Sequence, residues 1–312
     1  MQQLFEVLPT IARTDSTVLI EGETGTGKEL LARAIRALSQ RRTRPLVIVN
    51  CGALPDTLLE SEIFGYKAGA FTGAQSDKPG KISRAHRGTL FLDEVGEMSA
   101  ALQVRLLRVL QDGVFEPLGS VDSTEADVRF IAATHHDLSQ DVARGSFRED
   151  LFYRLNVVPV RLPPLRERKE DIPLLVDHFL GRFSARFDRE FSGVSPELLQ
   201  LLASHDYPGN IRELESTLEH ACVMCTGGTV QLAHLPVAWH QKTPASPDGL
   251  AAEIAEHEAR FIHDALERHG WHREATARDL GIHKATLFKK IRKLGIELPD
   301  TDGRSRRTRE EP

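Results

Sequence analysis

Two short motifs near the start of the chain have residue types and spacings that carry chemistry. The first matches the G-x-x-x-x-G-K phosphate loop, in which glycines let backbone N–H groups converge on phosphate oxygens. Its lysine can reach the terminal phosphates, and a helical pattern after the loop adds favourable partial charge. We therefore expect a nucleoside triphosphate to bind at Gly22, Glu23, Thr24, Gly25, Thr26, Gly27, Lys28 and Glu29.

The second motif ends in two adjacent carboxylates. An apolar segment over residues 89–93 closes with Asp93, and Glu94 follows it. Beside a phosphate loop, Asp93 can hold Mg²⁺ and Glu94 can polarise a water. Position 29 is Glu where the phosphate-loop pattern places Ser or Thr, so the usual hydroxyl ligand of magnesium is missing. Mg²⁺ would then be bound by Asp93, or Glu29 would contact it through a water.

Apolar segments that alternate with helical patterns are expected to position these motifs. Their nearly continuous apolar runs are typical of strands covered on both faces, and the intervening helices imply a mostly parallel sheet. This predicts an α/β domain over residues 1–164. The expected strands are 17–21, 46–50, 89–93, 129–134 and 156–162.

The rest of the chain is expected to be helical. Two prolines after the last strand open a helical subdomain over residues 165–237, in which Asn210 and Glu213 suggest a capping box. Cys222 and Cys225 are spaced like a metal or redox pair, but Cys222 continues an apolar stripe with Leu214, so core packing is the favoured interpretation. A polar linker is expected at 238–250, a helical unit at 251–296 and a disordered tail at 297–312.

Composition restricts the class of protein. A hydrophobic content of 40%, three cysteines and no long apolar run exclude a membrane protein and a secreted disulfide scaffold, so a cytoplasmic location is expected. The net charge is −5 overall, yet residues 271–294 hold seven basic and two acidic residues. Such local positive charge favours a nucleic-acid contact.

A hexapeptide in a glycine-punctuated stretch links these motifs to a known family. With its flanking motifs at residues 147–156, 163–168 and 207–213, the chain resembles the sigma-54-dependent transcriptional activators, or bacterial enhancer-binding proteins, of the AAA+ ATPase superfamily. The resemblance implies that the hexapeptide contacts sigma-54 and transmits ATP-driven movement to the RNA polymerase holoenzyme. Its residues are Gly69, Ala70, Phe71, Thr72, Gly73 and Ala74.

The same resemblance implies roles for several other residues. Asn50 would hold Glu94 in an inactive arrangement until the nucleotide state changes. Arg148 and Arg154 match the arginine-finger region, Arg154 being the stronger candidate, and Arg212 matches a nucleotide-sensing arginine. A guanidinium supplied by a neighbouring subunit stabilises charge on the γ-phosphoryl group, so activity requires a homo-oligomer, expected to be a hexamer.

The C-terminal unit resembles the family's Fis-type helix-turn-helix domain. Three expected helices carry an apolar stripe on one side and basic residues on the other, and such domains bind two half-sites of enhancer DNA as dimers. Early residues of the third helix would approach base edges and later ones would meet phosphates. The expected DNA contacts are His283, Lys284, Thr286, Lys289, Lys290 and Lys293.

The sequence also departs from the family's pattern. His135 and His136 follow the fourth expected strand where the family most often has Asn and Arg. The sequence begins at Met1 within the first expected helix, so we expect it to lack both the short apolar segment that helps to hold adenine in the family and an N-terminal regulatory domain. These departures and Glu29 leave open a DNA-binding regulator of this architecture with a degenerate ATPase. A different AAA+ machine, such as a chelatase or helicase loader, is disfavoured by the intact Phe71-Thr72 loop.

Overall fold

Five parallel strands form the central sheet, in the order β2-β5-β8-β1-β9. All are parallel, so their carboxyl ends meet at one edge, where Asn50 lies opposite Asp93 and Glu21 opposite Thr134. The predicted strands are confirmed with small shifts at their ends. Their bounds are β1 Val18–Glu21, β2 Leu46–Asn50, β5 Thr89–Asp93, β8 Arg129–Thr134 and β9 Val158–Arg161.

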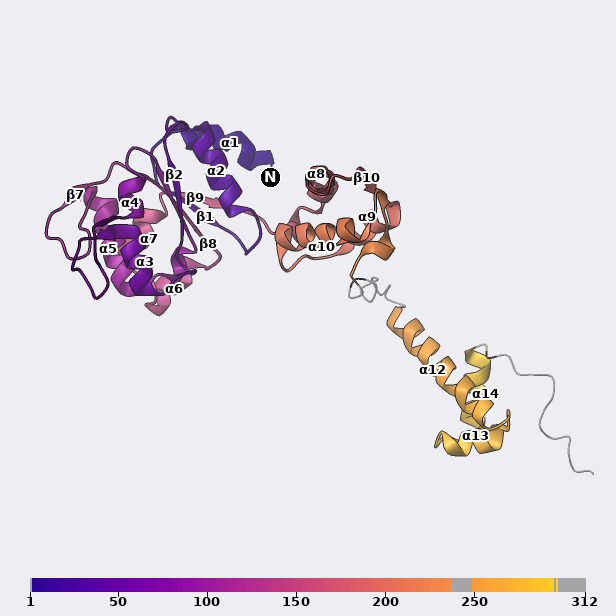
Figure 1. Ribbon diagram of the computed structural model, residues 1–312. Coiled ribbons are helices and arrows are strands. Elements are labelled where there is room, and N and C mark those ends of the chain that lie inside the picture. Colours follow the sequence, from indigo (N-terminus) through magenta and orange to yellow (C-terminus); the bar gives the residue numbers. More distant parts are fainter. Residues whose placement is uncertain (1, 237–238, 240–248, 295, 297–312) are drawn as a thin grey trace, which may run out of the picture. The chain divides into compact units, whose positions relative to one another are not determined.

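This sheet belongs to the first of two compact units of the computed structural model (Figure 1). The units are Met1–Pro236 and Val237–Pro312. The structure describes every residue except 1, 237–238, 240–248, 295 and 297–312. Most of the predicted linker at 238–250 and the predicted tail at 297–312 thus lie outside the described residues. No described helix is long and apolar enough to cross a bilayer.

Helices cover both faces of the sheet because successive strand residues point to opposite sides. On one face Ile20 and Phe91 pack in a cluster with residues of α1 and α2, and on the other Leu19 and Leu90 pack with residues of the remaining helices (Figure 1). The helices are α1 Gln2–Arg13, α2 Lys28–Leu38, α3 Asp56–Phe64, α4 Lys81–Arg84, α5 Ala100–Asp112, α6 Leu138–Arg144 and α7 Glu149–Leu155.

Two short antiparallel pairs extend this α/β region. One pairs β3 (Gly65–Tyr66) with β4 (Lys78–Pro79), so that the intervening hexapeptide is held at its base by backbone hydrogen bonds. The other pairs β6 (Val114–Phe115) with β7 (Thr124–Glu125).

The subdomain predicted at residues 165–237, which we call the lid, completes the first unit. Two details of its prediction are wrong. It is not wholly helical, because β10 and β11 form a parallel pair. The expected capping box is also absent: Glu213 accepts a hydrogen bond from the backbone of Gly209, while the side chain of Asn210 turns away from the helix. Cys222 and Cys225 are buried free thiols, as predicted. The elements are α8 Ile172–Phe187, β10 Phe191–Val194, α9 Pro196–Ser204, α10 Asn210–Met224 and β11 Gly228–Val230.

Three helices form the described part of the second unit. They are α12 (Gly249–Arg268), α13 (Arg273–Asp279) and α14 (Lys284–Lys293), and α12 begins two residues before the predicted boundary at 251. Ile262, Leu266, Ala277, Leu287 and Ile291 form their shared core. Phe261 on α12 lies outside this core, and its side chain is 64% exposed. The fold class, a parallel-sheet nucleotide-binding domain with a helical lid and a C-terminal helical domain, is confirmed.

Candidate active site

The phosphate loop connects β1 to the first turn of α2. Gly25 and Gly27 adopt φ angles of 82° and 101°, which favour glycine. The side chain of Lys28 is 7% exposed and lies along the loop, where Nζ donates to the carbonyl oxygen of Gly22 at 2.9 Å. The same atom lies 3.5 Å from Oε1 of Glu94, so the loop lysine is already aligned with the carboxylates at the end of β5.

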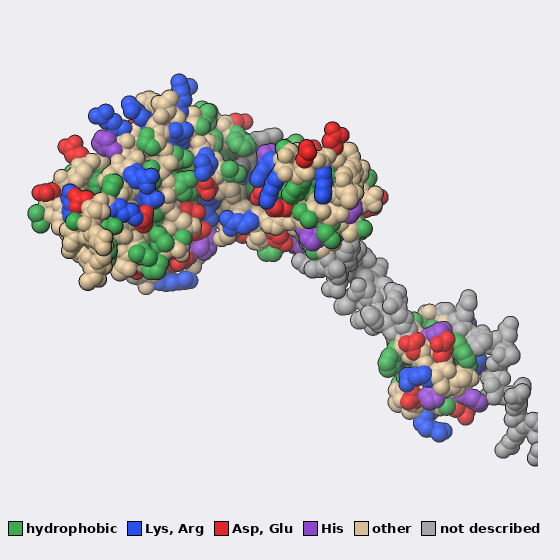
Figure 2. All heavy atoms as spheres, viewed as in Figure 1, with side chains coloured by type: hydrophobic (Ala, Val, Ile, Leu, Met, Phe, Trp, Pro, Cys, Tyr) green, Lys and Arg blue, Asp and Glu red, His purple; other side chains and the backbone are tan. Residues whose placement is uncertain are grey.

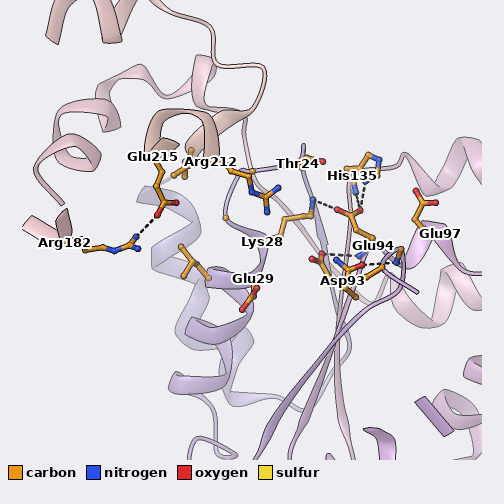
Figure 3. Close-up of a pocket in the computed structure, with 17 residues that line it drawn as sticks. Thr24, Lys28, Glu29, Asp93, Glu94, Glu97, His135, Arg182, Arg212 and Glu215 are labelled. Carbon is orange, nitrogen blue, oxygen red and sulfur yellow. Dashed lines mark hydrogen bonds and ion pairs between the residues drawn. The ribbon is translucent and has the colours of Figure 1, made fainter. Parts of the chain in front are cut away.

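An open pocket of about 690 Å³ lies above the loop. Figure 3 shows that its walls come from the phosphate loop, the end of β5 and helix α10 of the lid. The pocket brings together most of the predicted nucleotide-site residues, and it adds three charged residues that the prediction missed. From the prediction come Thr24, Gly25, Gly27, Lys28, Glu29, Asn50, Asp93, Glu94 and Arg212; the additions are Glu97, Arg182 and Glu215.

Asp93 has the properties of a magnesium ligand. It is half-buried, and burial together with the adjacent charge of Glu94 raises the pKa of its carboxyl group. Oδ1 accepts a hydrogen bond from the backbone of Glu94 at 3.2 Å, whereas Lys28 pairs with Glu94 rather than with Asp93. A carboxylate of this kind suits a hard divalent cation, which would compensate its charge.

Glu29 makes a different contact. Its Oε1 accepts from both Nε and a terminal nitrogen of Arg33, at 2.8 and 2.6 Å, on the exposed side of α2. The carboxylate at this position is therefore already engaged along its own helix. Glu29 is thus less available to a cation than Asp93 is.

Glu94 is held in place by the residue that directly follows β8. Its Oε2 lies 2.5 Å from Nδ1 of His135 and accepts from the backbone of His135 at 3.3 Å. Burial raises the pKa of Glu94, but the hydrogen bond from His135 and the charge of Lys28 outweigh it, so the pKa is lowered. Glu94 is therefore an ionised carboxylate with a fixed orientation.

The expectation for Asn50 needs correction. We expected its side chain to restrain Glu94, but Asn50 Oδ1 accepts from the backbone N–H of Gly52 at 2.9 Å. In this structure the side chains that contact the carboxylate of Glu94 are those of His135 and Lys28. Asn50 still lines the pocket, one strand away from Asp93.

A backbone hydrogen bond connects the lid directly to the phosphate loop. The backbone of Ile211 donates to the carbonyl oxygen of Gly25 at 3.0 Å, and a Cβ atom added at Gly25 would come 2.2 Å from the oxygen of Gly209. This close approach explains why glycine is required at position 25. It also brings Arg212 into the pocket, beside Glu215, whose Oε1 accepts from Arg182 at 3.0 Å (Figure 3).

Of the two candidate finger arginines, Arg148 precedes the first residue of α7 and Arg154 lies in its last turn, and neither lines the pocket of its own chain. Arg148 is paired with Asp150 at 2.7 Å. Arg154 is exposed and has no ion pair or hydrogen bond among the described residues. Arg154 is thus the arginine left available for another molecule.

The hexapeptide forms a closed turn with an aromatic tip. The backbone of Gly69 donates to Ala74 at 2.8 Å, and that of Ala74 donates to Phe71 at 3.0 Å. Phe71 is 46% exposed and contacts Tyr66 edge-on, with 5.0 Å between ring centroids. Thr72 is also exposed.

The predicted DNA-contact residues lie on and just before α14. The side chain of His283 caps this helix by accepting from the backbone of Ala285 at 3.4 Å. Lys284 pairs with Glu274 and Lys290 with Glu258, while Lys289 is exposed. Thr286 is also exposed, and the side chain of Lys293 lies outside the described residues. Figure 2 accordingly shows acidic and basic side chains side by side on this unit.

Fold and site together define an AAA+ type nucleotide-binding protein with a helical lid. The chain belongs to the sigma-54 interaction domain family, whose model matches residues 1–161. An AAA+ ATPase lid domain matches residues 166–252, and a bacterial regulatory protein of the Fis family matches residues 253–294.

Relatives extend over most of the chain. The transcriptional regulatory protein ZraR of Salmonella typhimurium is 48% identical over 293 residues, which cover 93% of this chain and 66% of that protein. The Nif-specific regulatory protein of Azotobacter vinelandii is 44% identical, covering 96% and 58%. The chain thus spans about two thirds or less of the length of these relatives.

Solved structures of other proteins share the fold of this chain. NtrX from Brucella abortus in complex with ADP has a TM-score of 0.72 and 33% identity, covering 95% of this chain and 68% of that one. Its complex with ATP has a TM-score of 0.69 and 34% identity, with the same coverage. A cryo-EM reconstruction of Hsp104, at 18% identity, covers 70% of this chain and 43% of that one, and its TM-score of 0.53 indicates a shared fold.

Proposed function

We propose that this chain is a sigma-54-dependent transcription activator that hydrolyses ATP in an oligomeric ring. The observation that carries the proposal is the convergence of Lys28, Asp93, Glu94 and Arg212 on one pocket of the unit that also presents the exposed Phe71 loop. The nucleotide complexes of NtrX, a structural relative, support ATP as the ligand. We assign the protein to the cytoplasm, where its polymerase and DNA partners are found.

Each residue of the pocket has a task suited to its position. Backbone N–H groups of the loop and Lys28 bind and orient the phosphates. Asp93 holds Mg²⁺, which when bound neutralises phosphate charge. Glu94 orients the attacking water, and because its Oε2 is bonded to His135, this contact must loosen before Glu94 can do so.

Arg212 and Arg154 connect hydrolysis to movement and assembly. Arg212 lines the pocket from the first turn of α10, so a phosphate that attracts its guanidinium also pulls on the lid. Arg154 does not line its own pocket, and we place it at the pocket of a neighbouring subunit in a ring, which we infer to be hexameric. There it would stabilise charge on the γ-phosphoryl group.

The two remaining surfaces meet the partners of the protein. The Phe71-Thr72 tip would contact sigma-54 in the closed complex of polymerase and promoter, because an exposed aromatic ring on a turn is suited to a protein contact. Helix α14 would enter the major groove of enhancer DNA, where its exposed residues Thr286 and Lys289 would contact it. The exposed Phe261 on α12 is consistent with pairing of two such units.

Open-complex formation at a sigma-54 promoter tests the proposal. We expect ATP turnover that rises with protein concentration, and open complexes that require hydrolysable ATP. Glu94→Gln should bind nucleotide but lose turnover by a factor of about 10²–10⁴, which is the usual contribution of general acid–base catalysis. Activation without ATP, or no turnover in the assembled protein, would contradict the proposal and favour the alternative of a DNA-binding regulator without ATPase activity.

A further inference from the structure

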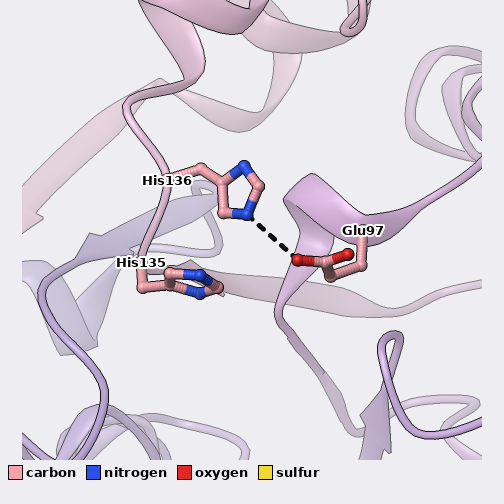
Figure 4. A group of neighbouring side chains, drawn as sticks. All are labelled: Glu97, His135 and His136. Atoms are coloured by element: carbon pink, nitrogen blue, oxygen red, sulfur yellow. Dashed lines mark hydrogen bonds and ion pairs between the residues drawn. The ribbon is translucent and has the colours of Figure 1, made fainter.

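Three side chains at the edge of the pocket are arranged like the ligands of a metal ion. Glu97 ends a short 3₁₀ helix (Val95–Glu97) after β5, and His135 and His136 follow β8 directly. Each places a ligand atom within 4.8 Å of the other two, and Nε2 of His136 lies 3.0 Å from Oε1 of Glu97 (Figure 4). This cluster is separate from Asp93, the proposed ligand of magnesium.

Both imidazoles also have the outer hydrogen bond that metal-bound histidines require. Nδ1 of His136 lies 2.9 Å from Oδ2 of Asp141, and Nδ1 of His135 lies 2.5 Å from Oε2 of Glu94. A histidine that ligates a metal through one ring nitrogen almost always donates the other N–H to a carboxylate or carbonyl, which fixes its tautomer. Nε2 of His136 faces Glu97, and Nε2 of His135 has no hydrogen-bond partner among the described residues, so each ring can offer this atom to a metal.

We propose that Glu97, His135 and His136 form a binding site for a transition-metal ion of the zinc class. Two imidazole nitrogens and one carboxylate match the ligands of an open Zn²⁺ site, in which water takes the fourth position. Mg²⁺ is a poor fit because it prefers oxygen ligands in an octahedral arrangement. The site is partly exposed, so an ion can enter from solvent.

Occupancy of this site would restrain Glu94. A metal on Nε2 of His135 keeps the proton on Nδ1, and this N–H then donates to Oε2 of Glu94. The carboxylate is held against His135 and cannot orient a water. Bound metal therefore slows ATP turnover, a consequence that rests on the proposed function, whereas the metal site itself does not.

Metal titration of the tag-free full chain without nucleotide tests the site. Co²⁺ is the probe, followed by visible absorption, with Zn²⁺ as competitor. We expect saturation at one equivalent, and at least about a tenfold loss of affinity in Glu97→Gln and in His136→Asn, which remove ligands. His263→Asn is the matched control, because His263, Asp264 and Glu267 form the other described cluster that could hold a metal. It should leave the titration unchanged.

Unchanged affinity in both ligand variants, or a loss confined to His263→Asn, would overturn the site. Circular dichroism and a thermal midpoint would establish that each variant is folded.

ATP turnover measured with and without one equivalent of Zn²⁺ tests the restraint on Glu94. The ratio of the two rates should fall several-fold in the parent chain, recover with a chelator and stay near one in His136→Asn. Tight Co²⁺ binding with a ratio of one in the parent would overturn the restraint. Absent turnover without Zn²⁺ would instead refute the proposed ATPase, and the titration would still decide the metal site.

Discussion

The side-chain nitrogen of Asn210 lies 3.1 Å from Oε2 of Glu23, so an amide at the start of the lid helix α10 is bonded to the phosphate loop. The same nitrogen donates to the carbonyl oxygen of Thr24 at 3.0 Å, and Oδ1 accepts from the backbone of Leu165 at 2.8 Å. Asn210 is fully buried. One side chain thus connects the loop, the lid helix and the segment that joins the lid to the sheet.

Asn210→Ala should therefore be strongly destabilising. The variant leaves the buried N–H of Leu165 without its acceptor and removes two further bonds, and it places alanine at a φ of 53°, which asparagine tolerates better. We expect a loss of about 2–4 kcal/mol in the free energy of unfolding, measured by urea denaturation.

A matched control for this variant is Asn156→Ala. Oδ1 of Asn156 is buried and has no hydrogen-bond partner among the described residues, so its removal should cost much less. Equal losses in the two variants would show that the bonds of Asn210 contribute nothing specific.

The pair formed by Glu23 and Arg166 predicts a dependence of stability on pH. Hydrogen bonds from Arg166 and Asn210 lower the pKa of Glu23 from its usual 4.5 to about 2. Because the folded-state pKa is depressed, the stabilisation is complete above pH 4.5 and is lost as the pH falls towards 2. The difference in unfolding free energy between the parent chain and Glu23→Gln should be constant from pH 5 to 7 and shrink below about pH 4. A difference that grows on acidification would contradict this assignment.

The sequence predicted the sheet well because its signals are local. Nearly continuous apolar runs such as residues 89–93 form strands that are buried on both sides. The glycines of the phosphate loop likewise mark the turn between strand and helix, because their φ angles are positive there. Because the strands are parallel, their carboxyl ends meet at one edge of the sheet, and this alone is enough to predict that Lys28 and Glu94 lie close together.

Contacts between distant segments could not be predicted in this way. Asn210 looked like half of a capping box because Glu213 stands three residues later, but its partners are 45 to 187 residues away in the sequence. Likewise, His135 was visible as a departure from the family's pattern, whereas its bond to Glu94 depends on how β5 and β8 pair. Such hydrogen-bond partners are determined by tertiary packing and cannot be predicted from a local sequence pattern.

Thr72→Ala should separate ATP turnover from activation. Thr72 is exposed on the turn between β3 and β4, and neither it nor Phe71 lines the nucleotide pocket. We expect the ATPase rate to stay within about twofold of the parent while open-complex formation at a sigma-54 promoter is lost, because surface substitutions away from buried features change little else. Lys28→Ala is the opposite case and should lose both. A parallel loss of turnover in Thr72→Ala would contradict a dedicated contact role.

Arg154→Ala should strongly lower ATP turnover, because Arg154 is proposed to complete the pocket of a neighbouring subunit. Arg154 has no partner among the described residues of its own chain, whereas Arg148 is paired with Asp150. We expect Arg154→Ala to lower turnover about 10³-fold or more, as arginine fingers do, while nucleotide binding remains. Arg148→Ala should lose less, because its guanidinium is already engaged.

Mixing variants decides whether Arg154 acts between subunits. A ring that contains both Lys28→Ala and Arg154→Ala chains has some interfaces in which an intact loop meets an intact Arg154. Turnover in the mixture should therefore exceed that of either variant alone, and it should peak near equal proportions. If Arg154 served the pocket of its own chain, every subunit in the mixture would carry a defect and no recovery would occur. Mixing Lys28→Ala with Glu94→Gln is the control, since both changes lie in the same pocket and leave no subunit intact.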